Sequence, residues 1–246
     1  MIFSNQPIQF TLLFILAVII AFTLHEVAHA LVAKWNGDYT AKFAGRITLN
    51  PVKHIDIIGF IMLLTVGFGY AKPVPVNPLN FRSPRKGIFL VSIAGVTINF
   101  ILAFFASFFA ILIFRFGDIW ASGFGGVMMR VFYYFFLFLL MINVNLIVFN
   151  LLPIFPLDGY HILENATKST NRFTKFMRNT GPYILIGLII FGALLGLIER
   201  LLGGRLPEWA NPLGYLIRVV GGRISTSLLK LWGLIFGVYV PWDFMS

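Results

Sequence analysis

Long apolar segments constrain the fold of this chain more than any other feature of its sequence. Most of them approach or exceed the ~20 residues that a helix needs to cross the hydrocarbon core of a bilayer. They lie at about 8–33, 55–70, 87–114, 127–152 and 181–198, with a weaker one at about 213–240. Charged residues make up only 11% of the chain, whereas soluble domains carry ~25%. We therefore predict an all-α polytopic membrane protein.

The segment at 55–70 differs from the others because it is short, rich in glycine and followed by prolines 73, 75 and 78. Proline breaks helices, so this segment has no straight helical continuation. Basic loops flank it at 34–53 and 72–86, and a full crossing would place them on opposite sides, against the positive-inside tendency. We predict a re-entrant element at 55–78, which could include a β-hairpin. Irregular backbone at membrane depth must be buried in protein or line a wet cavity.

With a re-entrant 55–78, every strongly basic loop lies on one side of the membrane. The segment at 87–114 leads outward, and 127–152 returns to a basic loop at 168–178. We expect this basic side to be cytoplasmic. The net charge of +10 then reflects loops beside anionic lipid, and we expect no nucleic-acid partner. The weak segment at 213–240 contains Lys230, so crossing the membrane and lying at its interface both remain open.

The first apolar segment contains the pattern His25-Glu26-Val27-Ala28-His29. Residues i and i+4 share one face of a helix, so His25 and His29 can direct two imidazoles at one point. Zinc takes such ligands, with a third protein ligand and one open position for water. Glu26 can then act as the base that takes a proton from that water. An ionisable side chain inside a membrane segment costs at least ~2.5 kcal/mol for a central charge, so these residues need a partner such as a metal ion.

The third ligand must be Asp or Glu, or another His, because the chain has no cysteine. Pro153 and Pro156 end the fourth segment while the chain is still apolar, which places Asp158 at membrane depth near the cytoplasmic end. The histidine pair lies at the same depth in the predicted topology, so Asp158 is our choice for the third ligand. Asp56, at the mouth of the re-entrant element, is the second candidate.

These motifs together resemble the site-2 protease family of zinc intramembrane metalloproteases. The resemblance covers about residues 8–165, with the motifs in the family's order. They are Phe22-Thr23-Leu24-His25-Glu26-Val27-Ala28-His29, Gly95-x-x-x-Asn99 and Asn150-x-x-Pro153 leading to Leu157-Asp158-Gly159, supported by the stretches 50–56 and 69–78. The chain has Ala94-Gly95-Val96 where the family more usually has Ala-Gly-Pro. It also contains no soluble stretch long enough for the PDZ or CBS domain that many members carry, so it looks like a minimal form.

The resemblance implies a three-helix catalytic core at 1–165 that carries one zinc ion per chain on His25, His29 and Asp158, with Glu26 as the base. Residues 166–246 would add further transmembrane and interfacial helices. It also implies a transmembrane protein as substrate, cleaved in regulated intramembrane proteolysis. We expect a multi-pass protein of a bacterial or archaeal cell membrane, with the active site toward the cytoplasm.

Asn99 and Asn150 have two possible roles. They could bond the unwound substrate backbone or the developing oxyanion, or they could simply join helices by polar contacts. The alternative function for the whole chain is a zinc-binding membrane transporter or a non-catalytic membrane protein, since transporters also place polar residues and broken helices at membrane depth. Glu26 discriminates between the two functions, because a transport site needs ligands but no base beside them.

Overall fold

The computed structural model describes residues 8–167, 171–202 and 206–240. Within these ranges the regular structure is helical, and no β-strand is present. Residues 168–170 of the third basic loop lie outside them. The long helices are α1 (Ile8–Trp35), α4 (Pro84–Phe116), α5 (Phe124–Asn150), α7 (Arg172–Leu202) and α8 (Pro212–Phe236). The short ones are α2 (Thr40–Phe43), α3 (Ile57–Val66), α6 (Asp158–Ala166) and the 3₁₀ turns η1 (Pro51–Lys53), η2 (Pro78–Asn80) and η3 (Glu208–Ala210).

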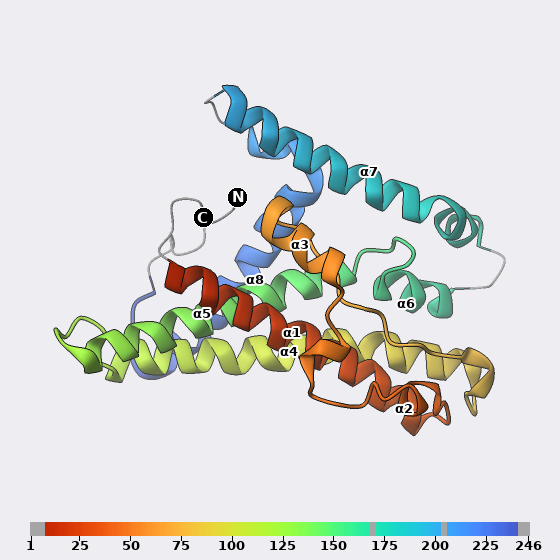
Figure 1. Ribbon diagram of the computed structural model, residues 1–246, viewed down its shortest axis with the longest axis horizontal. Coiled ribbons are helices and arrows are strands. Elements are labelled where there is room, and N and C mark those ends of the chain that lie inside the picture. The colour runs from red at the N-terminus through yellow and green to blue at the C-terminus, as the bar shows by residue number, and fades with distance from the viewer. Residues whose placement is uncertain (1–7, 168–170, 203–205, 241–246) are drawn as a thin grey trace.

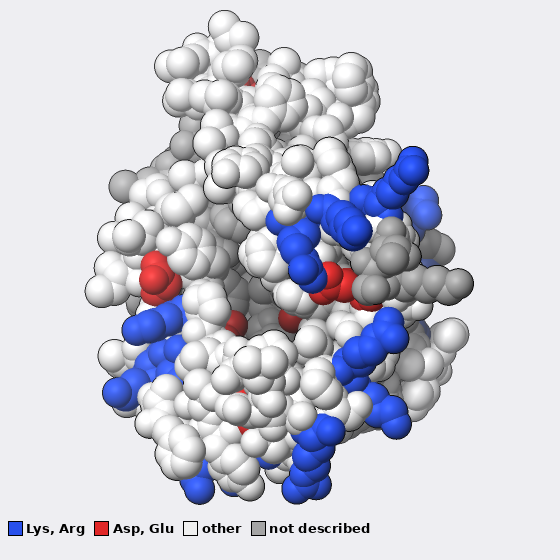
Figure 2. Space-filling model, turned by 90° about the vertical axis from the view of Figure 1, so that its right-hand side faces the viewer, with Lys and Arg blue, Asp and Glu red and all other residues white. Residues whose placement is uncertain are grey.

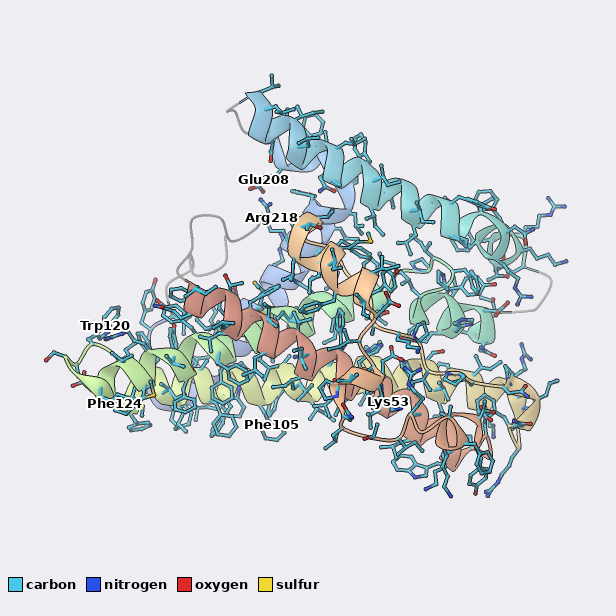
Figure 3. All side chains as sticks on the ribbon, viewed as in Figure 1. Lys53, Phe105, Trp120, Phe124, Glu208 and Arg218 are labelled. Atoms are coloured by element: carbon cyan, nitrogen blue, oxygen red, sulfur yellow. The ribbon has the colours of Figure 1, made fainter. Side chains whose placement is uncertain are left out.

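The five long helices are each long and apolar enough to cross a membrane. Large apolar side chains are exposed on these helices and on the loop that joins two of them: Phe105 on α4 is 53% exposed, Phe124 on α5 79%, and Trp120 in the loop between them 80% (Figure 3). Contiguous apolar surface of this extent is rare on soluble proteins and suits lipid. The chain is thus an integral multi-pass membrane protein, and the weak segment at 213–240 forms a helix of spanning length.

Helices α1, α4 and α5 pack on one another and form the centre of the molecule (Figure 1). Alanines line the contact: Ala17 and Ala21 on α1 and Ala103 and Ala110 on α4 are each 0% exposed. Small side chains allow membrane helices to approach closely, where van der Waals packing stabilises the pair. Larger side chains of α5, among them Leu140 at 0% exposure, fill the space beside them.

The C-terminal helices join this centre through α8, which packs on both α4 and α5. The indole N–H of Trp232 on α8 donates to the Ser107 hydroxyl on α4 at 3.1 Å. Helix α7 contacts α6 and α8 and lies apart from the central three helices (Figure 1). It begins at Arg172, nine residues earlier than the apolar segment at 181–198, and continues through Pro182.

The chain around α3 folds back on itself. The Asp56 side chain caps the start of α3, and Gly67 ends it in the left-handed region with φ 88°. A Cβ on Gly59 would lie 2.2 Å from the Tyr70 carbonyl oxygen, so the returning chain runs directly against the helix. Ile55 and Ala71 form an antiparallel bridge, which places the two ends of this segment side by side.

The β-hairpin that the sequence suggested for this element is not confirmed. The Ile55–Ala71 bridge is the β-pairing described there, and residues 72–77 have no regular structure. Pro73 and Pro75 have no N–H to donate to a ladder, which is the physical reason that pairing stops after one bridge.

Candidate metal centre

His25 and His29 on α1 and Asp158 on α6 bring their side chains together. Their potential ligand atoms all lie within 4.8 Å of one another. The two Nε2 atoms are 3.0 Å apart, and Asp158 Oδ2 lies 3.6 Å from that of His25 and 3.5 Å from that of His29. The three side chains are 10%, 12% and 14% exposed. Two histidines one helical turn apart and an aspartate distant in the sequence therefore meet at one point.

The cluster fits a divalent metal ion on its own chemistry. Asp158 Oδ2 is buried and has no hydrogen-bond partner among the residues that the structure describes, although a buried polar atom without a partner costs about 1–3 kcal/mol. Two imidazole nitrogens and a carboxylate oxygen are the three-ligand set that zinc takes in catalytic sites. A cation between these atoms would satisfy the orphaned oxygen and both nitrogens at once.

A tight turn after α5 places Asp158 at this point. Helix α5 ends at Asn150, and α6 begins at Asp158 itself. A Cβ on Gly159 would lie 2.3 Å from the Leu151 carbonyl oxygen, so the turn can close only because residue 159 is glycine. Asp56, the second candidate, is engaged elsewhere: its Oδ1 accepts the Gly59 N–H at 2.9 Å.

One face of α4 supports both histidines. His29 Nδ1 lies 2.7 Å from the Val91 carbonyl oxygen and can only donate to it, which leaves His29 Nε2 free to bind a metal. His25 Nδ1 lies 3.1 Å from the side-chain amide of Asn99. Between them, a Cβ on Gly95 would lie 2.4 Å from His25 Cε1 and 2.6 Å from His29 Nε2. Residues 91, 95 and 99 are spaced four apart and therefore form one stripe on α4.

Glu26 lies on α1 beside the histidines and is 8% exposed. Its Oε2 accepts the backbone N–H of Val74 at 2.9 Å. The guanidinium of Arg46, 6% exposed, donates to the carbonyl oxygens of Pro73 (2.9 Å) and Lys72. Arg46 thus holds the segment that contacts Glu26. Sequence reasoning assigned no individual role to Arg46 or Val74, because Arg46 counted only as a loop charge and Val74 acts through its backbone.

A family comparison decides the class of this centre. The profile described as Peptidase family M50 matches residues 13–194, a range that contains every residue of the cluster. The chain belongs to peptidase family M50, the site-2 protease family. It is accordingly a metalloprotease, a hydrolase that acts on peptide bonds.

Curated members of the M50 family are similar over most of this chain. "Putative zinc metalloprotease YwhC" of Bacillus subtilis is 40% identical over 194 residues, which cover 79% of this chain and 86% of that protein. "Putative zinc metalloprotease Rip2" of Mycolicibacterium smegmatis is 29% identical over 77% of this chain and 72% of its own length. "Zinc metalloprotease MJ0392" of Methanocaldococcus jannaschii is 28% identical over 77% of this chain and 45% of its own length. No solved structure matches the chain significantly.

The two asparagines for which the sequence left two roles open are placed differently in this M50 peptidase. Asn99 is 0% exposed and lies against His25. Asn150 is half-buried at the end of α5, where its Nδ2 donates to the Leu146 carbonyl of the same helix at 3.0 Å. The structure describes no contact between Asn150 and the cluster, so the two residues have different environments.

His54 and His161 also lie in different environments. His54 is 0% exposed, its Nε2 is 2.8 Å from the Thr48 carbonyl oxygen, and burial lowers its pKa below the ordinary value. Its own carbonyl accepts the Lys72 N–H at 2.8 Å, which joins the chain just before α3 to the chain that returns after it. His161 is 32% exposed and lies 3.9 Å from Glu164.

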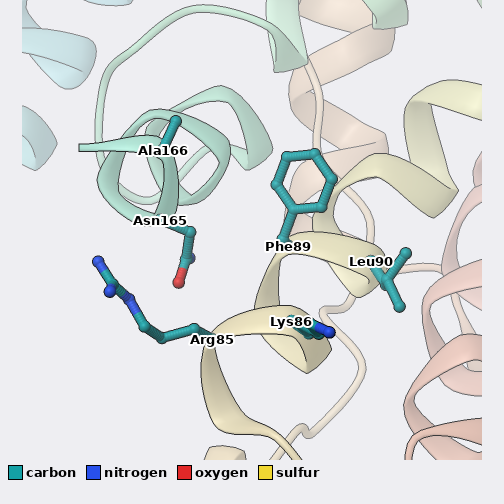
Figure 4. Close-up of a pocket in the computed structure, with 6 residues that line it drawn as sticks. All are labelled: Arg85, Lys86, Phe89, Leu90, Asn165 and Ala166. Carbon is teal, nitrogen blue, oxygen red and sulfur yellow. The ribbon is translucent and has the colours of Figure 1, made fainter.

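Lysine and arginine side chains gather around a hollow at the end of the molecule where α2, α6 and the start of α4 lie (Figure 2). A cavity of about 410 Å³ lies between the start of α4 and the end of α6 (Figure 4). It is lined by Arg85, Lys86, Phe89, Leu90, Asn165 and Ala166. None of these residues belongs to the cluster, so this cavity is separate from the metal centre.

Proposed function

We propose that this chain is an intramembrane zinc endopeptidase that hydrolyses peptide bonds within or near the transmembrane segments of other proteins. The observation that carries the proposal is the convergence of His25, His29 and Asp158 beside the buried Glu26, inside a bundle of membrane-spanning length. The relatives named as zinc metalloproteases support zinc as the metal. We propose one zinc ion per chain, held by these three ligands.

Zinc bound there would acidify a water molecule and polarise the substrate carbonyl. The protein's own residues supply the proton transfers. Glu26 takes a proton from the attacking water and delivers it to the leaving amine. The Val74 N–H fixes one carboxylate oxygen of Glu26, so the other oxygen is free for the proton. We propose Asn150 as a contact for the substrate backbone or the oxyanion, the role that the sequence suggested for it.

The substrate backbone must be exposed before it can react. A helix conceals its carbonyl groups in i→i−4 hydrogen bonds, so a transmembrane substrate has to unwind first. We propose that the unwound chain lies along the irregular segment 72–76, which the Val74–Glu26 contact places beside the site. An extended chain can pair there through its main chain, although Pro73 and Pro75 offer carbonyl groups alone.

We propose that 55–78 is re-entrant and that the site faces the cytoplasm of a bacterial or archaeal cell. The bridge between Ile55 and Ala71 supports the first part, because paired ends must lie at the same depth. The gathering of Lys and Arg side chains at one end of the molecule (Figure 2) supports the second, because basic residues gather on the cytoplasmic side of membrane proteins. The catalytic core at 1–165 and the additional helices at 166–246 remain our proposed division of the chain.

Substitution of Glu26 by Gln tests the function. The full chain, purified in detergent and reconstituted with zinc, is mixed with a reporter protein that contains one transmembrane segment. We expect wild type to cleave the reporter. E26Q should cleave it about 10²–10⁴-fold more slowly, which is the usual contribution of general acid–base catalysis, and should bind as much zinc as wild type. E208Q, at an exposed acid paired with Arg218, is the control and should cleave normally. Zinc-loaded wild type that cuts no reporter, or E26Q that cuts as fast as wild type, contradicts the proposal.

A further inference from the structure

The two histidines of the cluster each present one ring nitrogen to the metal site and one to α4. The Nε2 atoms face each other at 3.0 Å and face Asp158 Oδ2. On the other side of each ring, His29 Nδ1 meets the Val91 carbonyl oxygen at 2.7 Å, and His25 Nδ1 meets the carboxamide of Asn99 at 3.1 Å. Each histidine therefore has hydrogen-bonding partners on α4 behind it, and at His25 the Gly95 backbone joins Asn99.

The chemistry of a metal-binding imidazole decides what those partners must do. A neutral imidazole that gives its Nε2 lone pair to a metal carries its proton on Nδ1. That Nδ1–H must donate to an acceptor, which fixes the ring and raises the basicity of the ligand. The Val91 carbonyl is such an acceptor for His29. At His25 Nδ1 the Asn99 side chain lies 3.1 Å away, and the Gly95 backbone carbonyl, one turn earlier on α4, is also within hydrogen-bonding reach of this ring.

Asn99 can supply that acceptor through its Oδ1. The oxygen and nitrogen of a carboxamide exchange places by a half-turn, and the hydrogen-bond network decides which one faces a neighbour. Asn99 Oδ1 is buried and has no other partner among the described residues. Turned toward His25 Nδ1–H, it satisfies a buried donor and a buried acceptor together.

The position of Asn99 argues against direct contact with the substrate. The side chain is 0% exposed and lies behind the imidazole ring, on the side away from Nε2 and Asp158. An oxyanion would form on the metal side of that ring. The absence of a side chain at Gly95, one turn earlier, lets both rings lie flat enough against α4 to reach their partners.

We infer that Asn99 is a positioning residue of the metal centre: its side-chain oxygen accepts the Nδ1 proton of His25 and holds that imidazole as a metal ligand. This inference rests on the proposed zinc site and replaces, for Asn99, the oxyanion role suggested by the sequence. Loss of such a partner lowers metal affinity by about 10–100-fold in other metal sites.

The experiment compares two substitutions with opposite hydrogen-bonding capacity. N99L removes the acceptor, whereas N99D keeps an acceptor and removes the amide donor. Zinc affinity of the full chain in detergent is measured by competition with a chromogenic chelator, and reporter cleavage is measured beside it. N143L is the matched control, because Asn143 is equally buried but donates to Leu139 of its own helix at 2.7 Å.

We expect N99L to bind zinc about 10–100-fold more weakly than wild type, while N99D and N143L bind it within about threefold. Thermal unfolding of the zinc-free proteins identifies any variant that fails to fold. If N99L does not fold, N99D decides the question. Because its carboxylate can still accept the His25 Nδ1 proton, N99D should keep both zinc binding and cleavage. N99D that keeps zinc but loses cleavage supports an oxyanion donor and overturns the inference, as does N99L with wild-type zinc affinity. Wild type that binds no zinc overturns the proposed function itself.

Discussion

Substitution of Gly95 by Ala should damage the metal centre more than the fold. The new Cβ would lie 2.4 Å from His25 Cε1, about 1 Å short of the 3.4 Å at which ordinary contact begins. It would also lie 2.6 Å from His29 Nε2, so both imidazoles must move together. Such overpacking costs about 1–3 kcal/mol, partly offset by the ~0.5–1 kcal/mol that Ala gains over Gly within a helix. We expect a net loss of about 1–2 kcal/mol in the free energy of unfolding.

The metal site tolerates far less movement than the helix packing does. Coordination distances hold within about 0.2 Å, whereas the rings must shift by several times that. We therefore expect zinc affinity to fall at least tenfold and the cleavage rate by about 10²-fold, the effect of a 1 Å misplacement at a reacting centre.

Chelator competition, reporter cleavage and thermal unfolding of G95A in detergent measure the three quantities. The control is G187A on α7, where the space around an added Cβ is open within 4 Å; it should match wild type in zinc affinity and cleavage. G95A with wild-type zinc affinity and wild-type cleavage would refute the packing of α1 on α4 from which these numbers are worked.

Two further predictions concern the segments that hold the site. R46A removes the donor to the Lys72 and Pro73 carbonyls, so we expect about 1–3 kcal/mol of destabilisation and faster limited proteolysis at 72–76. K53A, at an exposed cation in η1, is the control and should change neither. Burial alone would raise the pKa of Asp38, but hydrogen bonds from Asn80, Thr40 and Asn77 outweigh it and lower the pKa below the ordinary value. The ionised Asp38 therefore stabilises the fold above pH ~4 and loses this effect as pH falls through its lowered pKa. Thermal unfolding should show D38N less stable than wild type at pH 7 and the difference narrowing below pH ~4; a difference that is constant with pH contradicts the assignment.

Local periodicity made the histidine part of the site predictable. An i, i+4 pair on a helix needs no tertiary information to share a face, and its place in an apolar segment implied a partner. Asp158 was predictable for a related reason, because Pro153 and Pro156 stop the helix before the apolar stretch ends. Family motifs then agreed with both assignments, and the structure brings the three side chains within 4.8 Å.

The partners of these residues were less predictable, because they lie far apart in the sequence. Arg46 acts through the carbonyls of Lys72 and Pro73, and Val74 acts through its backbone N–H. Backbone groups occur at every residue, so no sequence pattern distinguishes the ones that are used. Gly95 was part of a recognised motif, but the reason that the position needs glycine is visible only in the structure. A Cβ there would clash with the imidazole rings of two histidines on α1.

The sequence by itself determined the membrane class and the helical architecture, and it singled out the residues that we propose as metal ligands, because hydropathy and helical period act over a few neighbouring residues. Only the tertiary structure decided that Asp56 caps α3 while Asp158 joins the histidines, and that Asn99 is buried against His25. These outcomes depend on how α1, α4 and α6 pack, and packing is set by the shapes of side chains that meet from distant parts of the chain.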